Sequence, residues 1–207
     1  MNDKIKSEDF SLEDLRAGDR IEFARLVDAY SGVIYRLAVK ILENPQDAED
    51  VLQETFIKAY RHLKNFDGRS SISTWLYRIA TNEALMMLRK HKHISVSIDE
   101  PMNAADQEQE PIQIVDWCCL PETELMSTEA QVYLDQAVKE LPHSLRVVFL
   151  LRDIEGLSTK ETSEVLNLSE AAVKTRLSRA RFRLRELLSE YFGEKIASFQ
   201  SLKGDRP

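Results

Sequence analysis

Basic side chains are concentrated near the carboxyl end of the chain, in a segment whose pattern predicts a helix-turn-helix. Ser158 is a good N-cap and Glu161 completes a capping box, so a short helix begins there. Residues 167–169 break that helix, and Ser169 can cap a second one. The second helix has a basic run without acidic residues: Lys174, Arg176, Arg179, Arg181, Arg183 and Arg185. A helix-turn-helix places its second helix in the DNA major groove, where Arg and Lys read guanine edges.

The second helix of this pair is expected to have one buried side and one exposed side. Apolar residues recur at helical spacing and form the buried side: Val173, Leu177, Ala180 and Leu184. The other side and its flanks carry the residues that would contact duplex DNA: Lys174, Thr175, Arg176, Ser178 and Arg179. The alternative is a helix whose basic side is only solvated, and the rest of the chain decides between the two.

Aromatic and cationic side chains also surround a loop that we predict at residues 65–71. Single-stranded nucleic acid binds where bases stack on rings and phosphates pair with Lys and Arg, and each stacked base contributes roughly 1–3 kcal/mol. The residues that fit this chemistry are Lys58, Arg61, Phe66, Arg69, Trp75, Arg78 and Asn82. For Trp75 a place in the hydrophobic core is a serious alternative, but core packing does not require Arg69 or Arg78.

Carboxylates dominate residues 47–54, in the first turns of an expected helix, where the helix dipole favours them. Asp50 and Glu54 are one turn apart on the same face, so they repel mildly when they have no partner. A basic protein surface would relieve that repulsion. Metal binding is a weaker interpretation, because no histidine is nearby and carboxylates four residues apart are common.

The sequence contains no arrangement typical of an enzyme and predicts no cofactor or metal site. Cys118 and Cys119 are adjacent and lack a partner motif, so a passive linker position is favoured over redox sensing or binding of a soft metal. His91 and His93 could form a weak metal pair, but a solvated helix end explains them better.

Net charge is −7 over 207 residues, which is unusual for a protein that binds DNA. The charge is unevenly distributed, because residues 94–128 contain eight acidic residues and no Lys or Arg. A chain of this kind could meet DNA with the help of a larger partner. It has no apolar run long enough to span a membrane and no secretory signal, so we expect a cytoplasmic protein without membrane insertion.

Hydrophobic periodicity predicts an all-α fold: two small helical domains joined by an acidic linker, the second ending in the helix-turn-helix. Asp19 is expected to cap the first long helix, Pro45 to begin the next, and a third to start near Ser73. The last helix is expected to fade near Gly193. The predicted boundaries are 7–93 for the first domain, 94–127 for the linker, 128–192 for the second domain and 193–207 for a tail.

Several strings together resemble the extracytoplasmic function (ECF) group of the sigma-70 family of RNA polymerase sigma factors. They are Asp47-Ala48-Glu49-Asp50-Val51-Leu52-Gln53-Glu54, Thr74-Trp75-Leu76-Tyr77-Arg78-Ile79-Ala80-x-Asn82, Glu155-Gly156-Leu157-Ser158 and Val173-Lys174-x-Arg176-Leu177-x-Arg179-Ala180-Arg181. Each string alone is moderately specific, and their order and spacing in a short chain are much more so. The resemblance covers about residues 23–188 apart from the linker. It implies that the first domain is the family's region 2 and the second its region 4.

The resemblance implies a promoter-specificity subunit of core RNA polymerase that helps to melt promoters and catalyses nothing itself. The face that binds the polymerase beta-prime clamp would be Asp47, Asp50, Gln53 and Glu54, and the beta flap would be a further contact. The loop at 65–71, including Asp67, would work with Arg78 and Asn82 to capture the non-template strand of the minus-ten element, one base being flipped into a pocket. The second helix of the helix-turn-helix would read the minus-thirty-five element, and an anti-sigma factor is the expected regulator.

Two other functions were weighed against this one. A stand-alone helix-turn-helix repressor or activator would leave the acidic face at 47–54 and the helix after residue 73 unexplained. A helical redox or metal sensor would depend on Cys118 and Cys119. The first alternative differs from the sigma factor in binding duplex promoter without polymerase, and metal analysis with a Cys-to-Ser double change tests the second.

Overall fold

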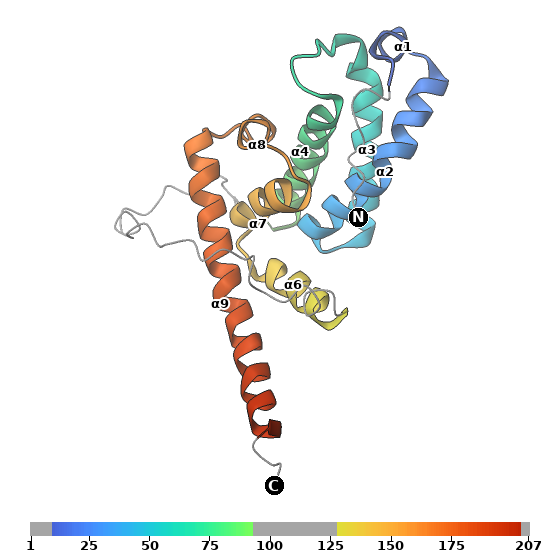
Figure 1. Cartoon of the computed structure of the whole chain (residues 1–207). Coiled ribbons are helices and arrows are strands. Elements are labelled where there is room, and N and C mark those ends of the chain that lie inside the picture. Colours follow the sequence, from blue (N-terminus) through green and yellow to red (C-terminus); the bar gives the residue numbers. More distant parts are fainter. Residues whose placement is uncertain (1–9, 93–127, 204–207) are drawn as a thin grey trace.

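The computed structural model describes residues 10–92 and 128–203, and the regular elements within those ranges are all helical, as predicted (Figure 1). The amino-terminal half consists of α1 (Leu12–Ala17), α2 (Arg20–Leu42), α3 (Pro45–His62) and α4 (Ile72–Lys92). The carboxy-terminal half consists of α6 (Thr128–Glu140), α7 (His143–Phe149) with a π-helical turn (Leu150–Ile154), α8 (Thr159–Leu166) and α9 (Glu170–Lys203). None of the described helices combines the length and apolarity that a membrane crossing requires.

Helices α2 and α3 begin where capping chemistry predicts. The Asp19 carboxylate accepts the backbone N–H groups of Ile21 and Glu22, each at 2.8 Å. The Asn44 side chain accepts the N–H of Gln46 at 3.0 Å, and Pro45 occupies the first turn of α3. These bonds satisfy backbone donors that have no partner within the helix, so the caps fix both starting points.

The short helix α1 was not predicted. Ser11 caps its start, and Gly18 ends it in the left-handed conformation, at a φ of 83° that favours glycine. Leu15 is almost completely buried against the bundle of α2, α3 and α4. The helix is therefore held by tertiary packing, because a helix of this length is not stable alone.

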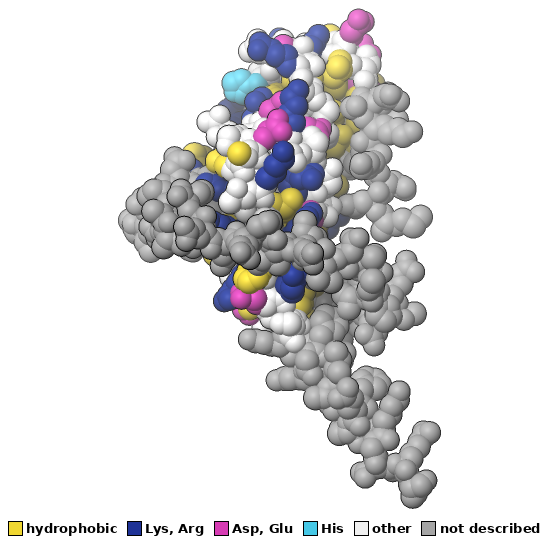
Figure 2. All heavy atoms as spheres, turned by 60° about the vertical axis from the view of Figure 1, so that its left-hand side comes forward, with side chains coloured by type: hydrophobic (Ala, Val, Ile, Leu, Met, Phe, Trp, Pro, Cys, Tyr) yellow, Lys and Arg dark blue, Asp and Glu magenta, His cyan; other side chains and the backbone are white. Residues whose placement is uncertain are grey.

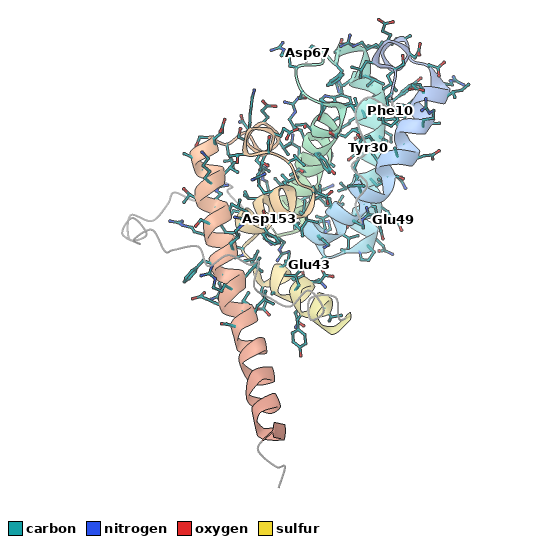
Figure 3. The ribbon with its side chains drawn as sticks, in the orientation of Figure 1. Phe10, Tyr30, Glu43, Glu49, Asp67 and Asp153 are labelled. Atoms are coloured by element: carbon teal, nitrogen blue, oxygen red, sulfur yellow. The ribbon has the colours of Figure 1, made fainter. Side chains whose placement is uncertain are left out.

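The two halves pack against each other and share one hydrophobic core. Leu37 and Val51 from the first half belong to the same buried cluster as Val148 and Leu151 from the second. Two hydrogen bonds also cross the boundary: Tyr77 Oη donates to Glu155 Oε2 at 2.8 Å, and Thr74 Oγ1 donates to Glu161 Oε1 at 3.1 Å. Two ion pairs cross it as well. Lys40 Nζ lies 3.2 Å from Asp135 Oδ1, and Arg146 pairs with Glu43. Figure 3 shows Glu43 at the end of α2 nearest to α6.

The expectation for the end of the last helix was wrong. Helix α9 continues through Gly193 to Lys203 and forms the long rod that runs away from the other helices in Figure 1. A single glycine costs about 1 kcal/mol relative to alanine within a helix, and good helix formers on both sides offset such a cost. The predicted linker, which contains Cys118 and Cys119, lies outside the described residues, and so does His93.

Candidate functional site

Helices α8 and α9 form the helix pair that the sequence predicts between residues 158 and 185. Ser158 Oγ accepts the N–H of Glu161 at 3.1 Å, and Glu161 Oε2 accepts the N–H of Ser158 at 2.8 Å, which completes the capping box. Asn167 ends α8 with a positive φ of 52°. Ser169 Oγ then accepts the N–H of Ala172 at 3.1 Å and starts α9.

The outer side of α9 carries all the candidates for contact with duplex DNA. Lys174, Thr175 and Ser178 are exposed, and Arg176 and Arg179 are half-buried at the flanks. The predicted inner side, Val173, Leu177, Ala180 and Leu184, is buried. This division between a buried and an exposed side is the one that a helix reading the major groove requires.

Two arginines further along α9, Arg181 and Arg183, pair with acidic side chains. Arg181 donates from Nε and Nη2 to the two carboxylate oxygens of Asp153, at 2.9 and 2.7 Å, and this bidentate pair raises the pKa of Arg181. Arg183 lies 3.0 Å from Glu186 on the same helix. Asp153 lies beside α9 in Figure 3. The Arg181 pair fastens α9 to the turn after α7.

The loop between α3 and α4 is ordered by its own side chains. Asp67 accepts the backbone N–H of Arg69 at 3.1 Å, and this bond is the main cause that lowers the pKa of Asp67. The Arg69 guanidinium lies 2.6 Å from the same carboxylate, yet 89% of its side chain is exposed. Gly68 has a φ of 77°, which a turn of this shape requires. Asp67 lies at the outer end of this loop in Figure 3.

Cations extend from this loop along the neighbouring surface. Arg61, Arg78 and Asn82 are exposed, as the prediction for single-stranded DNA needs. Figure 2 turns the side of α8 and α9 forward and shows Lys and Arg side chains recurring over much of the described surface, with acidic side chains among them. Exposed Lys and Arg side chains can pair with phosphate groups, whatever the net charge of the whole chain.

Phe66 and Trp75 lie in the core and do not offer their rings to a base in this structure. Their side chains are 5% and 8% exposed, and the two ring centroids are 5.1 Å apart. For Trp75, the structure confirms the alternative of a place in the hydrophobic core. The rings of Phe66 and Trp75 pack beneath the loop, on its core side. They would have to move before a DNA base could stack on them.

Lys58 also lies apart from the loop with which it was grouped. Its Nζ is 2.7 Å from Glu83 and 3.6 Å from Glu54, and the hydrogen bond to Glu83 is the main cause that raises its pKa. Helical phase explains this position, because residues 54 and 58 are one turn apart on α3. The structure thus places Lys58 with the acidic residues.

The acidic residues line a groove of about 440 Å³ between α3 and α4. All four predicted polymerase-binding residues are among those that line it: Asp47, Asp50, Gln53 and Glu54. Helix α4 forms the other side of the groove, which was not predicted, and supplies Glu83, Met86, Met87, Lys90 and His91. Met86 and Ile57 are large apolar residues, 53% and 43% exposed. The spacing of residues 83, 86, 87 and 90 on one helical face is the signal that could have found them.

The groove can bind a protein surface that is basic and partly apolar. The described residues contain no group of three His, Cys, Asp or Glu side chains arranged to hold a metal ion. Large exposed apolar side chains, Ile57 and Met86, lie among the charged residues of the groove, a mixture that matches the helix-in-groove mode of recognition.

Family models match both halves of the chain. Residues 26–94 match sigma-70 region 2, and residues 131–184 match sigma-70 region 4. The ECF RNA polymerase sigma factor SigW of Bacillus subtilis is 37% identical over 179 residues, which cover 86% of this chain and 95% of that protein. The ECF RNA polymerase sigma-E factor of Escherichia coli is 32% identical over 170 residues, which cover 82% of this chain and 88% of that protein.

Solved structures agree with the fold. CnrH, solved in complex with the cytosolic domain of CnrY, is 27% identical, with a TM-score of 0.60 over 86% of this chain and 95% of that chain. The sigma factor RpoE of Bartonella quintana, solved with the anti-sigma factor NepR, is 23% identical, with a TM-score of 0.60 over 81% of this chain and 96% of that chain. The second likeness shows a shared fold.

Proposed function

The chain belongs to the ECF group of the sigma-70 family, and from this membership we propose that it directs core RNA polymerase to specific promoters and helps to melt them. The observation that supports the proposal is that one chain carries three surfaces of the kind that a sigma factor needs: the groove between α3 and α4, the loop after α3, and the outer side of α9. Each has the chemistry of a binding surface, so the proposed mechanism is binding in the cytoplasm, without catalysis or a cofactor.

The groove would bind the beta-prime clamp of core polymerase through Asp47, Asp50, Gln53 and Glu54. Asp47 and Glu54 already lie near His91 and Lys58, so a basic surface would add further ion pairs in the groove, including one with the exposed carboxylate of Asp50. Lys58, which pairs with Glu83 and Glu54, supports the shape of this groove. The beta flap would contact the second domain. We propose that the first domain spans residues 7–93 and the second spans residues 128–192.

The loop after α3 would capture the melted non-template strand of the minus-ten element. Arg61, Arg69, Arg78 and Asn82 are exposed and could meet phosphates and base edges, and Asp67 holds the loop in shape. Phe66 and Trp75 would form the floor beneath a flipped base. This arrangement would favour melted DNA over duplex DNA, because a base stacked in the duplex cannot reach these contacts.

The outer side of α9 would read the minus-thirty-five element as duplex in the major groove. Its candidates are Lys174, Thr175, Arg176, Ser178 and Arg179. Cationic side chains would combine contacts to phosphate with contacts to base edges, and the two hydroxyls could meet either.

An anti-sigma factor would regulate this protein by acting on the packing between its halves. In the present arrangement α8 lies against α4, and Thr74 and Tyr77 at the amino-terminal end of α4 bond to the second half. Binding of the non-template DNA strand near Thr74 and Tyr77 would therefore compete with the packing of the second half against α4. A partner that holds the halves together would keep the protein inactive. Support comes from the related CnrH, which was solved in complex with the cytosolic domain of CnrY.

A gel-shift experiment with promoter fragments, with and without core polymerase, tests the proposal against its rivals. The expected result is a shifted band only when both the chain and core polymerase are present. A repressor or activator would shift intact duplex by itself. A redox or metal sensor would lose its activity when Cys118 and Cys119 are both changed to serine, whereas the proposed function predicts unchanged transcription.

A further inference from the structure

Helix α1 is a fixed arm that lies before the part of the chain matching the region 2 model, which begins at residue 26. Its start is tied to α2, because the backbone N–H of Ser11 donates to Glu22 Oε1 at 2.8 Å. Phe10 contacts Tyr30, with ring centroids 6.0 Å apart, and Leu15 is 1% exposed. Figure 3 shows Phe10 and Tyr30 close together on this side of the bundle. The arm therefore has a defined position on the bundle.

The carboxyl end of this arm reaches the loop between α3 and α4. Arg16 Nε donates to the backbone carbonyl of Phe66 at 2.8 Å, across a sequence separation of fifty residues. A Cβ built at Gly68 would lie 3.4 Å from an Nη atom of Arg16, so the guanidinium lies directly beside the loop backbone. Arg16 is half-buried there.

The Phe66 carbonyl is well placed to control the loop. It follows the 3-10 turn Leu63–Asn65, and the Phe66 N–H donates to the carbonyl of Leu63 at 3.0 Å. The ring of Phe66 is packed against Trp75, and the Asp67–Arg69 contacts begin at the next residue. Arg16 supplies the tertiary bond that holds this carbonyl from outside the loop.

We propose that Arg16 is a positioning residue for capture of the minus-ten strand. Its Nε–H fixes the backbone at Phe66 so that Asp67, Gly68 and Arg69 keep the shape that receives a flipped base. This inference rests on the proposed function. The physical advantage is preorganisation, because a loop that is ordered before binding loses less conformational freedom when the strand arrives.

Three substitutions separate positioning from a direct contact between the Arg16 charge and a phosphate. Arg16→Gln keeps an N–H donor at the site of Nε and removes the charge. Arg16→Lys keeps the charge but puts a methylene at the site of Nε and its donors one atom further out, so the bond to the Phe66 carbonyl loses its present geometry. Arg16→Met keeps much of the stem, and hence the packing, but removes both. Positioning predicts that only the glutamine variant retains binding, whereas phosphate contact predicts that only the lysine variant does.

The test uses holoenzyme reconstituted from the full chain and core RNA polymerase. The probe is a fork-junction DNA with a single-stranded non-template minus-ten segment, taken from a promoter at which this holoenzyme initiates. For Arg16→Met and Arg16→Lys we expect fork affinity to fall about 3- to 10-fold, the effect of one lost hydrogen bond. Affinity for core polymerase and for minus-thirty-five duplex should be unchanged. Arg20→Ala, which removes an exposed charge at the start of α2, is the matched control and should bind normally.

Salt dependence gives a second readout that a direct phosphate contact would change. Loss of one phosphate contact lowers the slope of log affinity against log salt by about 0.7–0.9. Positioning predicts that the slope of Arg16→Met equals that of the unaltered chain. Recovery of binding by Arg16→Lys, or a reduced slope, would overturn the inference and leave the proposed function standing. If unaltered holoenzyme fails to bind the fork, the proposed function falls, and the inference with it.

Discussion

The hydrogen bond from Tyr77 to Glu155 gives a quantitative test of the packing between the two halves. Tyr77 Oη donates to Glu155 Oε2 at 2.8 Å across the boundary between α4 and the π-helical turn. Burial raises the pKa of the Glu155 carboxyl, and the bond from Tyr77 together with the charges of Arg36 and Lys40 partly offsets that effect. Tyr77→Phe removes the donor and leaves the carboxylate in the same place.

The expected cost follows from the surroundings of Glu155. A hydrogen bond to a charged group contributes about 1.5–3 kcal/mol. Glu155 keeps some contact with solvent and has cations nearby, so we expect the lower end, about 1.5 kcal/mol, or roughly a tenfold change in an equilibrium constant. The tyrosine ring is retained as phenylalanine, so no cavity contributes to the change.

Urea unfolding followed by circular dichroism measures this cost, with Tyr60→Phe as the control. Tyr60 is 43% exposed, so loss of its hydroxyl should change the free energy of unfolding by less than about 0.5 kcal/mol. For Tyr77→Phe we expect a decrease of about 1.5 kcal/mol near pH 8 and a smaller decrease near pH 5, because the carboxyl is then protonated more readily. A change no larger than that of the control at both pH values would refute the reasoning.

Four further predictions concern the pH response, the groove, the outer side of α9 and the capping box of α8. The pKa of Glu155 is raised in the folded state, so the protonated carboxyl contributes stability that is complete below the unfolded-state pKa and is lost as pH rises through the folded-state pKa. Glu155→Gln should remove this decrease in the free energy of unfolding, measured by urea unfolding across that pH range. Asp50→Arg with Glu54→Arg should abolish co-purification with core polymerase, whereas Glu49→Arg, outside the groove, should not; normal co-purification of the double variant would reject the interface. Arg179→Ala should weaken use of one promoter base pair by about 1–3 kcal/mol in binding assays on single-base promoter variants, and equal loss on all of them would contradict base reading. Ser158→Ala should lower stability by about 1 kcal/mol in thermal unfolding through loss of the capping box, and no change in melting temperature would show that the cap is dispensable.

Local chemistry explains why some elements could be predicted from the sequence. Asp19, Asn44 and Ser158 each satisfy backbone N–H groups within three residues, so the helix starts depend on neighbours that the sequence displays directly. The buried side of α9 follows from helical period in the same way. The three acidic residues that α3 contributes to the groove, Asp47, Asp50 and Glu54, share a face of that helix for this reason too.

Features that depend on distant residues were beyond the sequence analysis. Helix α1 is too short for a periodic signal, and Arg16 finds its partner fifty residues away. The sequence could not decide whether Phe66 and Trp75 face the core or solvent, because both positions suit a large aromatic side chain. The bond between Glu155 and Tyr77, one of the contacts between the halves, joins residues that are far apart in the sequence. Lys58 is different, since its i,i+4 spacing from Glu54 on α3 is a local signal that the sequence displays directly.

Transcription in vitro from genomic DNA, with mapping of every start site, tests the central claim most directly. The account predicts that core polymerase plus this chain initiates at a limited set of sites that share two upstream elements, and that neither component does so alone. Start sites identical to those of core polymerase by itself, together with binding of intact duplex DNA by the free chain, would contradict it.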